Sequence, residues 1–253
     1  MIKSLDRISY FTNSLKETEN TFSTFFDEKP SQKIVSKDRN YESLLYMFEN
    51  VNFEIIKKNN ASSEEDKLIG FSLLSDDLTS LNISTLFDEY ENNEESQDKV
   101  QLVKSIDIKQ SPDFQLSVNQ YEDSNMGRSN NNNLFALDHL VLTTDKSDAL
   151  INLYEKELGI RLALDQFVEK WGGRMLFFRT GHTTIEVIDN KVEGNDQFWG
   201  LAWKTKDIRK KREYLIENGF NVTDVKDGRK KDTLVATVKF DKIKIPTLLV
   251  EHL

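Results

Sequence analysis

The sequence contains no cysteine among its 253 residues. This absence excludes disulfides, thiolate metal sites and a cysteine nucleophile. Histidine is scarce too, with three residues, and no GxSxG, HExxH, Walker or dinucleotide-binding Rossmann pattern occurs. The sequence therefore offers little for nucleophilic catalysis.

Long apolar runs are also missing. No stretch of 18 apolar residues occurs, and residues 1–10 lack the apolar region of a secretory signal. We therefore expect a cytoplasmic protein with no membrane partner. The formal net charge is -9, which repels phosphate, so we expect no nucleic-acid partner. The basic run at residues 226–231 is interrupted by Asp227 and Gly228, and it reads as a solvated turn.

Length and composition indicate a globular protein with two domains. A chain of 253 residues favours two domains, and 38% hydrophobic with 30% charged residues is within the globular range. Residues 123–134 are rich in asparagine and have low complexity, which is typical of a linker. The predicted domains are therefore residues 1–122 and 135–253.

Short strands alternate with single helices along the chain. Helices are expected at residues 14–27, from Asp77 onwards with Leu78, Leu81 and Leu86 on one side, and at 145–158 and 207–218, the last two ending at Gly159 and Gly219. Strands are expected at residues 5–11, 33–35, 44–48, 51–56, 68–74, 100–108, 114–119, 136–142, 162–167, 174–179, 183–189, 198–203 and 246–252. The predicted fold class is α+β, with four βαβββ units in two pairs.

The two halves of the chain repeat one another at a fixed offset. Arg7 and His139 are 132 positions apart (139 − 7), and so are Glu54 and Glu186 (186 − 54). Asn119 falls on Glu251 at the same offset. Self-similarity that persists from strand to strand indicates a duplicated domain.

The second half resembles the vicinal oxygen chelate superfamily, which includes glyoxalase I, extradiol dioxygenases and bleomycin-resistance proteins. The residues that carry this resemblance are Leu137-Asp138-His139-Leu140-Val141-Leu142, Leu153-Tyr154 with Leu158-Gly159, Arg174-Met175-Leu176-Phe177-Phe178, Ile185-Glu186-Val187-Ile188, Gly200-Leu201-Ala202-Trp203 with Asp207-Ile208, and Pro246-Thr247-Leu248-Leu249-Val250-Glu251. The resemblance implies that paired units form a curved mixed sheet, with the helices outside and a divalent metal inside the cup.

The candidate site consists of one imidazole and two carboxylates. Strand alternation places His139, Glu186 and Glu251 each on one face of its own strand. Buried carboxylates are costly unless they are paired, protonated or metal-bound. We therefore expect His139, Glu186 and Glu251 to bind Fe, Mn, Zn or Ni, with Glu186 or Glu251 also acting as a base. The alternative is that His139 is an ordinary core histidine.

The sequence departs from the family pattern at several positions. The resemblance implies a further ligand at Leu201, which cannot bind a metal. In the first half, Arg7 and Asn119 replace two of the ligands while Glu54 is retained. We therefore expect Arg7 and Glu54 to form an ion pair in place of a metal, which would leave the first domain structural.

Several large side chains could contact a ligand. Arg174, beside Gly172 and Gly173, is the candidate for holding an anionic substrate. The candidates for lining the cup are Phe167, Trp171, Trp199 and Trp203, and the alternative for each is ordinary core or surface packing. His182 and His252 are expected to be exposed.

Three functions remain open from the sequence. The first is a metal-dependent enzyme, a lyase or dioxygenase, that acts on a small oxygen-rich molecule. The second is a metal-free protein that binds or sequesters a small molecule. The third is a fold kept for assembly alone, and the paired units also suggest a homodimer.

Overall fold

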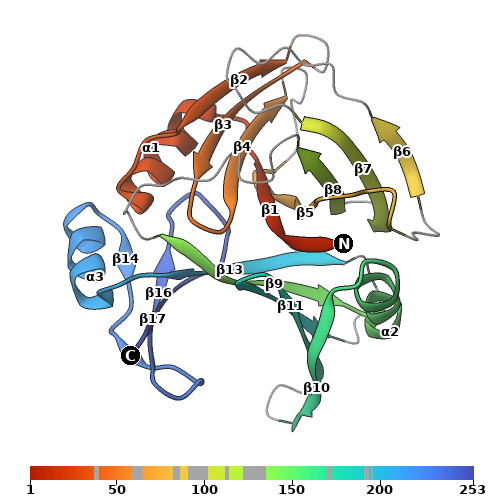
Figure 1. Cartoon of the computed structure of the whole chain (residues 1–253). Helices are drawn as coiled ribbons and strands as arrows, with labels where there is room; N and C mark the ends of the chain where they lie inside the picture. Colours follow the sequence, from red (N-terminus) through yellow and green to blue (C-terminus); the bar gives the residue numbers. More distant parts are fainter. Residues whose placement is uncertain are drawn as a thin grey trace. The chain divides into compact units, whose positions relative to one another are not determined.

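A computed structural model describes residues 1–36, 40–58, 65–81, 86–90, 102–111, 114–121, 135–169, 173–190, 194 and 196–253 (Figure 1). The predicted linker at residues 123–134 and Trp171 lie outside these residues. Helices in the described part of the chain are all too short or too polar to cross a membrane.

The first half forms one mixed sheet with the strand order β2-β3-β4-β1-β5-β8-β7-β6. Its elements are β1 (Ile2–Phe11), α1 (Leu15–Phe26), β2 (Gln32–Ser36), β3 (Tyr41–Met47), β4 (Asn52–Lys58), β5 (Lys67–Ser75), β6 (Leu86–Tyr90), β7 (Leu102–Ser111) and β8 (Phe114–Tyr121). Helix α1 packs on β3 and β4 through the buried rings of Phe22 and Phe26, while the buried ring of Phe25 contacts Phe135, Phe220 and Phe240. The helical spacing of Phe22 and Phe26 buries one face of α1 against the sheet.

The second half repeats this plan, with the strand order β10-β11-β12-β9-β13-β17-β16-β14 and β15 paired with β16. Its elements are β9 (Ala136–Thr144), α2 (Ser147–Ile151), the π-helical turn η1 (Asn152–Glu157), β10 (Arg161–Val168), β11 (Gly173–Thr180), β12 (Thr183–Asp189), β13 (Gln197–Lys204), α3 (Ile208–Glu217), β14 (Asn221–Val222), β15 (Lys226–Asp227), β16 (Thr233–Lys239) and β17 (Thr247–His252). The matching strand orders confirm the duplication that the sequence predicted.

A glycine marks the same close approach in both halves. Strands β5 and β8 pair in parallel, and so do β13 and β17. A Cβ at Gly70 would collide with the carbonyl oxygen of Gln115, and a Cβ at Gly200 would lie 2.6 Å from that of Pro246. Both strand pairs therefore need a residue without a side chain at this point.

One predicted helix is wrong. Residues 77–81 form a turn, and Leu86 begins β6 instead of continuing a helix. The Asp77 carboxylate accepts hydrogen bonds from the backbone N–H and the hydroxyl of Thr79, at 2.9 and 2.6 Å. Aspartate that bonds its own backbone two residues on favours a turn over a helix.

By packing, the chain divides into two compact units that each draw on both halves. Unit 1 comprises Met1–Arg7, Ile69–Gly127 and His139–Trp199, and unit 2 comprises Ile8–Leu68, Arg128–Asp138 and Gly200–Leu253. The core of unit 1 includes Phe71, Tyr154 and Phe178, and Tyr154 donates its buried hydroxyl to Gln110 at 2.7 Å. The core of unit 2 gathers aromatic rings around Trp203.

Candidate functional site

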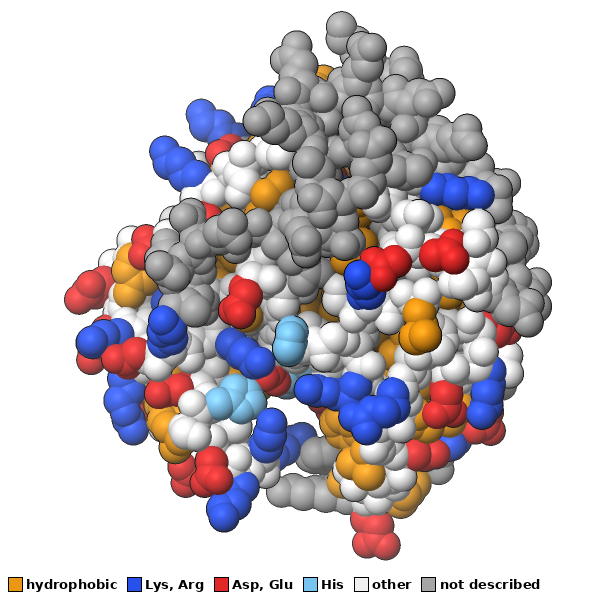
Figure 2. Space-filling view, viewed as in Figure 1, with side chains coloured by type: hydrophobic (Ala, Val, Ile, Leu, Met, Phe, Trp, Pro, Cys, Tyr) orange, Lys and Arg blue, Asp and Glu red, His pale blue; other side chains and the backbone are white. Residues whose placement is uncertain are grey.

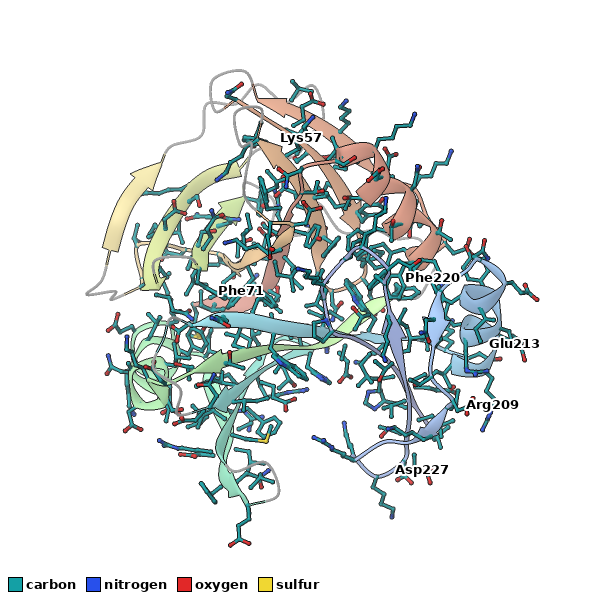
Figure 3. The ribbon with its side chains drawn as sticks, turned by 180° about the vertical axis from the view of Figure 1, so that it is seen from behind. Lys57, Phe71, Arg209, Glu213, Phe220 and Asp227 are labelled. Atoms are coloured by element: carbon teal, nitrogen blue, oxygen red, sulfur yellow. The ribbon has the colours of Figure 1, made fainter. Side chains whose placement is uncertain are left out.

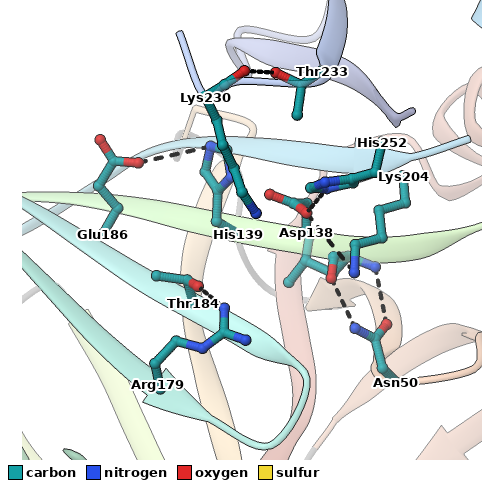
Figure 4. A network of polar contacts seen from close by, with 11 residues as sticks. Asn50, Asp138, His139, Arg179, Thr184, Glu186, Lys204, Lys230, Thr233 and His252 are labelled. Carbon is teal, nitrogen blue, oxygen red and sulfur yellow. Dashed lines mark hydrogen bonds and ion pairs between the residues drawn. The ribbon is translucent and has the colours of Figure 1, made fainter. Parts of the chain in front are cut away.

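His139 and Glu186 face each other on neighbouring strands of unit 1 (Figure 4). The parallel register of β9 and β12 sets Thr184 opposite His139 and Glu186 opposite Val141, so all these side chains share one face. The Nε2 of His139 lies 3.8 Å from the Oε2 of Glu186, and the two side chains are 21% and 18% exposed. The structure therefore brings together two of the three predicted ligands.

The alternation of side chains along β12 explains why Glu186 is partly exposed. Ile185 and Val187 are fully buried on one side of the strand. Glu186 and Ile188 point to the opposite side and stay partly exposed. The apolar side chains thus anchor the strand, and the side chain of Glu186 stays partly exposed.

Arg179 and Phe177 extend the same face on strand β11. The antiparallel register sets Arg179 opposite Thr184 and Phe177 opposite Glu186. Arg179 donates from Nη1 to the hydroxyl of Thr184 at 2.6 Å (Figure 4). His139, Thr184 and Arg179 therefore form a row across three adjacent strands. Arg179 was not among the site residues predicted from the sequence, although its position two residues after Phe177 on a predicted strand places both on one face.

The chemistry of His139 and Glu186 fits part of a divalent metal centre. Imidazole nitrogen and carboxylate oxygen bind such ions at about 2.0–2.2 Å, so donors that share an ion lie within about 4.4 Å of each other. The 3.8 Å separation meets this limit. Within the described ranges, however, no group of three or more His, Asp or Glu side chains is placed to hold a metal. If an ion were bound, the pair would supply two ligands, and water or substrate would occupy the remaining positions.

Glu251, the third predicted ligand, lies in unit 2 and has a structural contact there. Its Oε2 accepts the backbone N–H of Ile208, the first residue of α3, at 2.8 Å. Leu201, where the resemblance implied a further ligand, is buried in the same unit.

Arg174 is already paired with two carboxylates, contrary to its predicted role as a substrate anchor. It donates to Asp165 from Nε and Nη2 at 2.7 and 2.6 Å, and to Asp148 from Nη1 at 2.6 Å. These bonds raise the pKa of Arg174 and lower that of Asp165. Because three N–H donors of Arg174 already bind carboxylates of the protein, we leave Arg174 out of the proposed site.

The predicted aromatic lining divides into exposed and buried members. Phe167 and Trp199 are 59% and 53% exposed in unit 1. Trp203 is 1% exposed, and its ring centroid lies 5.0 Å from Phe26 and 5.3 Å from Phe48. Trp203 is therefore a core residue of unit 2, and we leave it out of the proposed site as well.

A polar network in unit 2 was not foreseen. The Nε2 of His252 lies 2.7 Å from Oδ1 of Asp138, and Nζ of Lys204 lies 3.8 Å from the same oxygen (Figure 4). His252 is exposed, as predicted, and its ring also contacts Asp138. In the first half, Tyr121 likewise donates to Asp6 at 2.9 Å. The sequence repeat could have identified these aspartates, because Asp6 and Asp138 are equivalent positions that lie 132 residues apart (138 − 6).

The first half keeps Glu54 buried, and its Oε1 accepts the hydroxyl of Ser43 at 2.7 Å. The ion pair of Arg7 with Glu54 stays a prediction. Asn119 donates to Asp6 at 2.6 Å and accepts from Ser105 at 2.7 Å, so it serves a buried hydrogen-bond network in unit 1.

A separate cavity of about 220 Å³ lies beside α3 in unit 2 (Figure 3), and its lining is Arg209, Arg212, Glu213, Asp224 and Val225. Arg212 is bound to Asp224 at 2.7 Å. On the face shown in Figure 2, positive and negative side chains lie among one another over the coloured surface. Neither feature adds a residue to the site around His139.

Comparison with known proteins finds similarity to one family model and to solved structures. Residues 138–237 match a sequence model described as the glyoxalase/bleomycin resistance protein/dioxygenase superfamily. A mutant of 4-hydroxymandelate synthase from Streptomyces coelicolor has a similar structure, with TM-score 0.72, 11% identity and coverage of 99% of this chain and 92% of that chain. BphC, a halotolerant catechol dioxygenase, gives TM-score 0.66 and 11% identity over 99% of this chain and 87% of that one. A search of curated proteins found no match.

Proposed function

We propose that the chain is a metal-dependent enzyme acting on a small oxygen-rich molecule. The proposal is supported by the match of residues 138–237 to the glyoxalase/bleomycin resistance protein/dioxygenase superfamily model and by the similarity of the fold to two solved structures. The observation that carries this proposal is the pair of His139 and Glu186, whose donor atoms lie 3.8 Å apart on one sheet face. Both proteins in the structural comparison are named for enzymes, a synthase and a catechol dioxygenase.

His139 and Glu186 would hold a divalent ion of Fe, Mn, Zn or Ni. When bound, such an ion stabilises negative charge that develops on neighbouring oxygens of a substrate. Glu186 has a second role in the proposal, since a partly exposed carboxylate beside the substrate can accept a proton. Thr184 lies between His139 and Arg179 and keeps the polar row continuous. The open coordination positions suit a substrate that presents two adjacent oxygens.

The test is elemental analysis of protein purified without chelator or a metal-affinity column. We expect near-stoichiometric metal in the wild type and its loss in His139→Ala and Glu186→Gln. His182→Ala is the matched control, because His182 is exposed in the turn between β11 and β12. A wild type that is metal-free and takes up none on titration contradicts the proposal, as does metal that survives in His139→Ala.

A second candidate is a metal-free small-molecule binding protein. It is favoured by the lack, within the described ranges, of a group of three or more metal-binding side chains. Under this alternative, His139→Ala keeps its affinity for an organic ligand found by thermal-shift screening. Under the enzyme proposal, the same substitution removes both the metal and the activity.

Two further expectations belong with the proposal. We propose a homodimer, which light scattering coupled to size-exclusion chromatography tests by mass against the 29.4 kDa chain. We also propose a cytoplasmic location, which fractionation of the source cells would test.

A further inference from the structure

Among the residues that the structure describes, the guanidinium of Arg179 has one hydrogen-bond partner. Arg179 is exposed on β11, and Nη1 donates this hydrogen bond to the hydroxyl of Thr184 at 2.6 Å. A guanidinium has several N–H donors arranged as a fork that matches a carboxylate. One donor fixes the group in place, and the others remain available to a ligand.

Arg174 on the same strand shows the opposite arrangement. It lies five residues earlier (179 − 174), so alternation directs it to the other face of the sheet. Three of its hydrogen bonds go to Asp165 and Asp148. The two arginines of β11 thus differ in their partners. Arg174 forms hydrogen bonds to other elements of the fold, whereas Arg179 lies on the same sheet face as His139 and Glu186.

The same face offers apolar contact next to this charge. Phe177 lies opposite Glu186 in the register and is partly exposed. On the edge strand β10, Leu164 lies opposite Phe177 and is 45% exposed. Adjacent strands lie about 4.8 Å apart, so Arg179, Phe177 and Leu164 are within reach of one small molecule.

We propose that Arg179 anchors the carboxylate of a small organic acid whose apolar group packs on Phe177 and Leu164. This inference rests on the proposed function in one respect: the end of the acid that reacts would lie near His139 and Glu186. Thr184 is a positioning residue, because it holds the guanidinium through its hydroxyl. Glu186 carries a negative charge on the same face, which selects for an acid that places its carboxylate at Arg179.

The test uses phenylacetate and phenylacetamide, which share an aromatic group and differ in charge. Isothermal titration calorimetry on the full chain should show that the wild type prefers phenylacetate. Arg179→Gln should weaken phenylacetate binding about ten-fold or more, as expected for loss of a charge-assisted pair, and leave phenylacetamide unchanged. Arg174→Gln is the matched control on the same strand and should bind phenylacetate like the wild type.

Three results would overturn the inference. They are a wild type that binds no phenylacetate, a wild type that prefers the amide, and an Arg179→Gln variant with wild-type affinity for phenylacetate. Thr184→Val offers a milder test if Arg179→Gln folds poorly. It keeps the arginine and removes the hydroxyl, so it should weaken binding of the acid and leave binding of the amide unchanged. Equal affinity of Thr184→Val and wild type for the acid would contradict the positioning role.

Metal content measured on the same variants separates this inference from the proposed function. Metal-free protein that still binds phenylacetate through Arg179 would reject the metal-dependent enzyme and support the carboxylate anchor. Metal that depends on His139, together with acid binding that does not depend on Arg179, would reject the anchor and support the enzyme. Arg179→Gln itself should keep the wild-type metal content.

Discussion

The carboxylate of Glu251 lies at the amino end of α3, where its Oε2 accepts the backbone N–H of Ile208 at 2.8 Å. The first N–H groups of a helix have no partner within the helix. Asp207 satisfies a second one, by accepting from the backbone of Lys210 at 3.0 Å. The two carboxylates thus accept from two backbone N–H groups at the start of α3, and their negative charge stabilises the positive end of the helix dipole.

Glu251→Ala should therefore lower the free energy of unfolding by about 1 kcal/mol, the usual effect of losing a helix cap. Glu251→Gln should cost less, because the amide oxygen can still accept from Ile208. Metal content should stay unchanged in both variants. Urea denaturation and elemental analysis measure the two effects, with the exposed Glu217→Ala as control. Loss of metal from Glu251→Gln would instead support the role of Glu251 as a ligand.

Trp203 and Trp199 should differ sharply in their effect on stability. Trp203 is 1% exposed and packs on Phe26 and Phe48, so Trp203→Ala should cost about 3–5 kcal/mol. Trp199 is 53% exposed, and Trp199→Ala should change stability by less than about 0.5 kcal/mol. Denaturant unfolding measures both. Similar losses in the two variants would contradict the core assignment of Trp203.

Arg174 should make stability depend on pH in the acidic range. The Arg174 guanidinium lowers the pKa of Asp165 below its ordinary value of 3.8. The stabilisation is therefore present above pH 3.8 and is lost as pH falls through the folded-state pKa. The side chains are 31% and 36% exposed, so solvent screening keeps the effect at pH 7 below about 1 kcal/mol.

This dependence is measured by comparing the wild type with Arg174→Gln in urea at pH 7 and near pH 3. We expect a difference in unfolding free energy at pH 7 that shrinks in acid. Asp148→Asn is a suitable comparison, because Asp148 is 88% exposed and should contribute little. A difference between wild type and Arg174→Gln that is equal at both pH values would contradict the assignment.

Lys211 should titrate near pH 8. Burial lowers its pKa from 10.5 to about 8, while Asp27 acts in the opposite direction. Its Nζ lies 4.7 Å from the ring centroid of Phe135 and 4.6 Å from that of Tyr214. These ring contacts favour the charged form, but the loss of water around the amine outweighs them.

The sign of the pH effect follows from the two states. Between pH 8 and 10.5 the unfolded chain keeps the proton and the folded chain releases it, so stability rises with pH in this window. Lys211→Met removes this dependence, and its stability relative to the wild type should fall between pH 7 and pH 10. Chemical denaturation across that range measures the change. A constant difference would show that Lys211 keeps an ordinary pKa.

The local elements were predictable because they depend on neighbouring residues. Alternation placed Glu186 on one face of its strand, and in the structure it lies on the face opposite to the buried Ile185 and Val187. Gly159 and Gly219 end their helices with positive φ, as their positions predicted. The helix expected at Asp77 was wrong, because side-chain bonds to Thr79 favour a turn that apolar spacing does not report.

The candidate site was predictable only in part. The repeat and the resemblance identified His139 and Glu186, and the register of β9 and β12 brings them together. Arg174 was predicted as the substrate anchor, and the sequence does not show that Asp165 and Asp148 bind it. Asp148, which binds Arg174, is 26 positions away in a different element.

The sequence by itself determined the duplicated α+β architecture, the strand faces and the pair of His139 with Glu186. These features depend on the periodicity of apolar residues and on the internal repeat, and both can be read directly from the sequence. Only the tertiary structure decided that Trp203 is in the core, that Glu251 caps α3 and that Arg179 donates to Thr184. Burial and pairing are set by residues distant in sequence, which come together only when the sheets form.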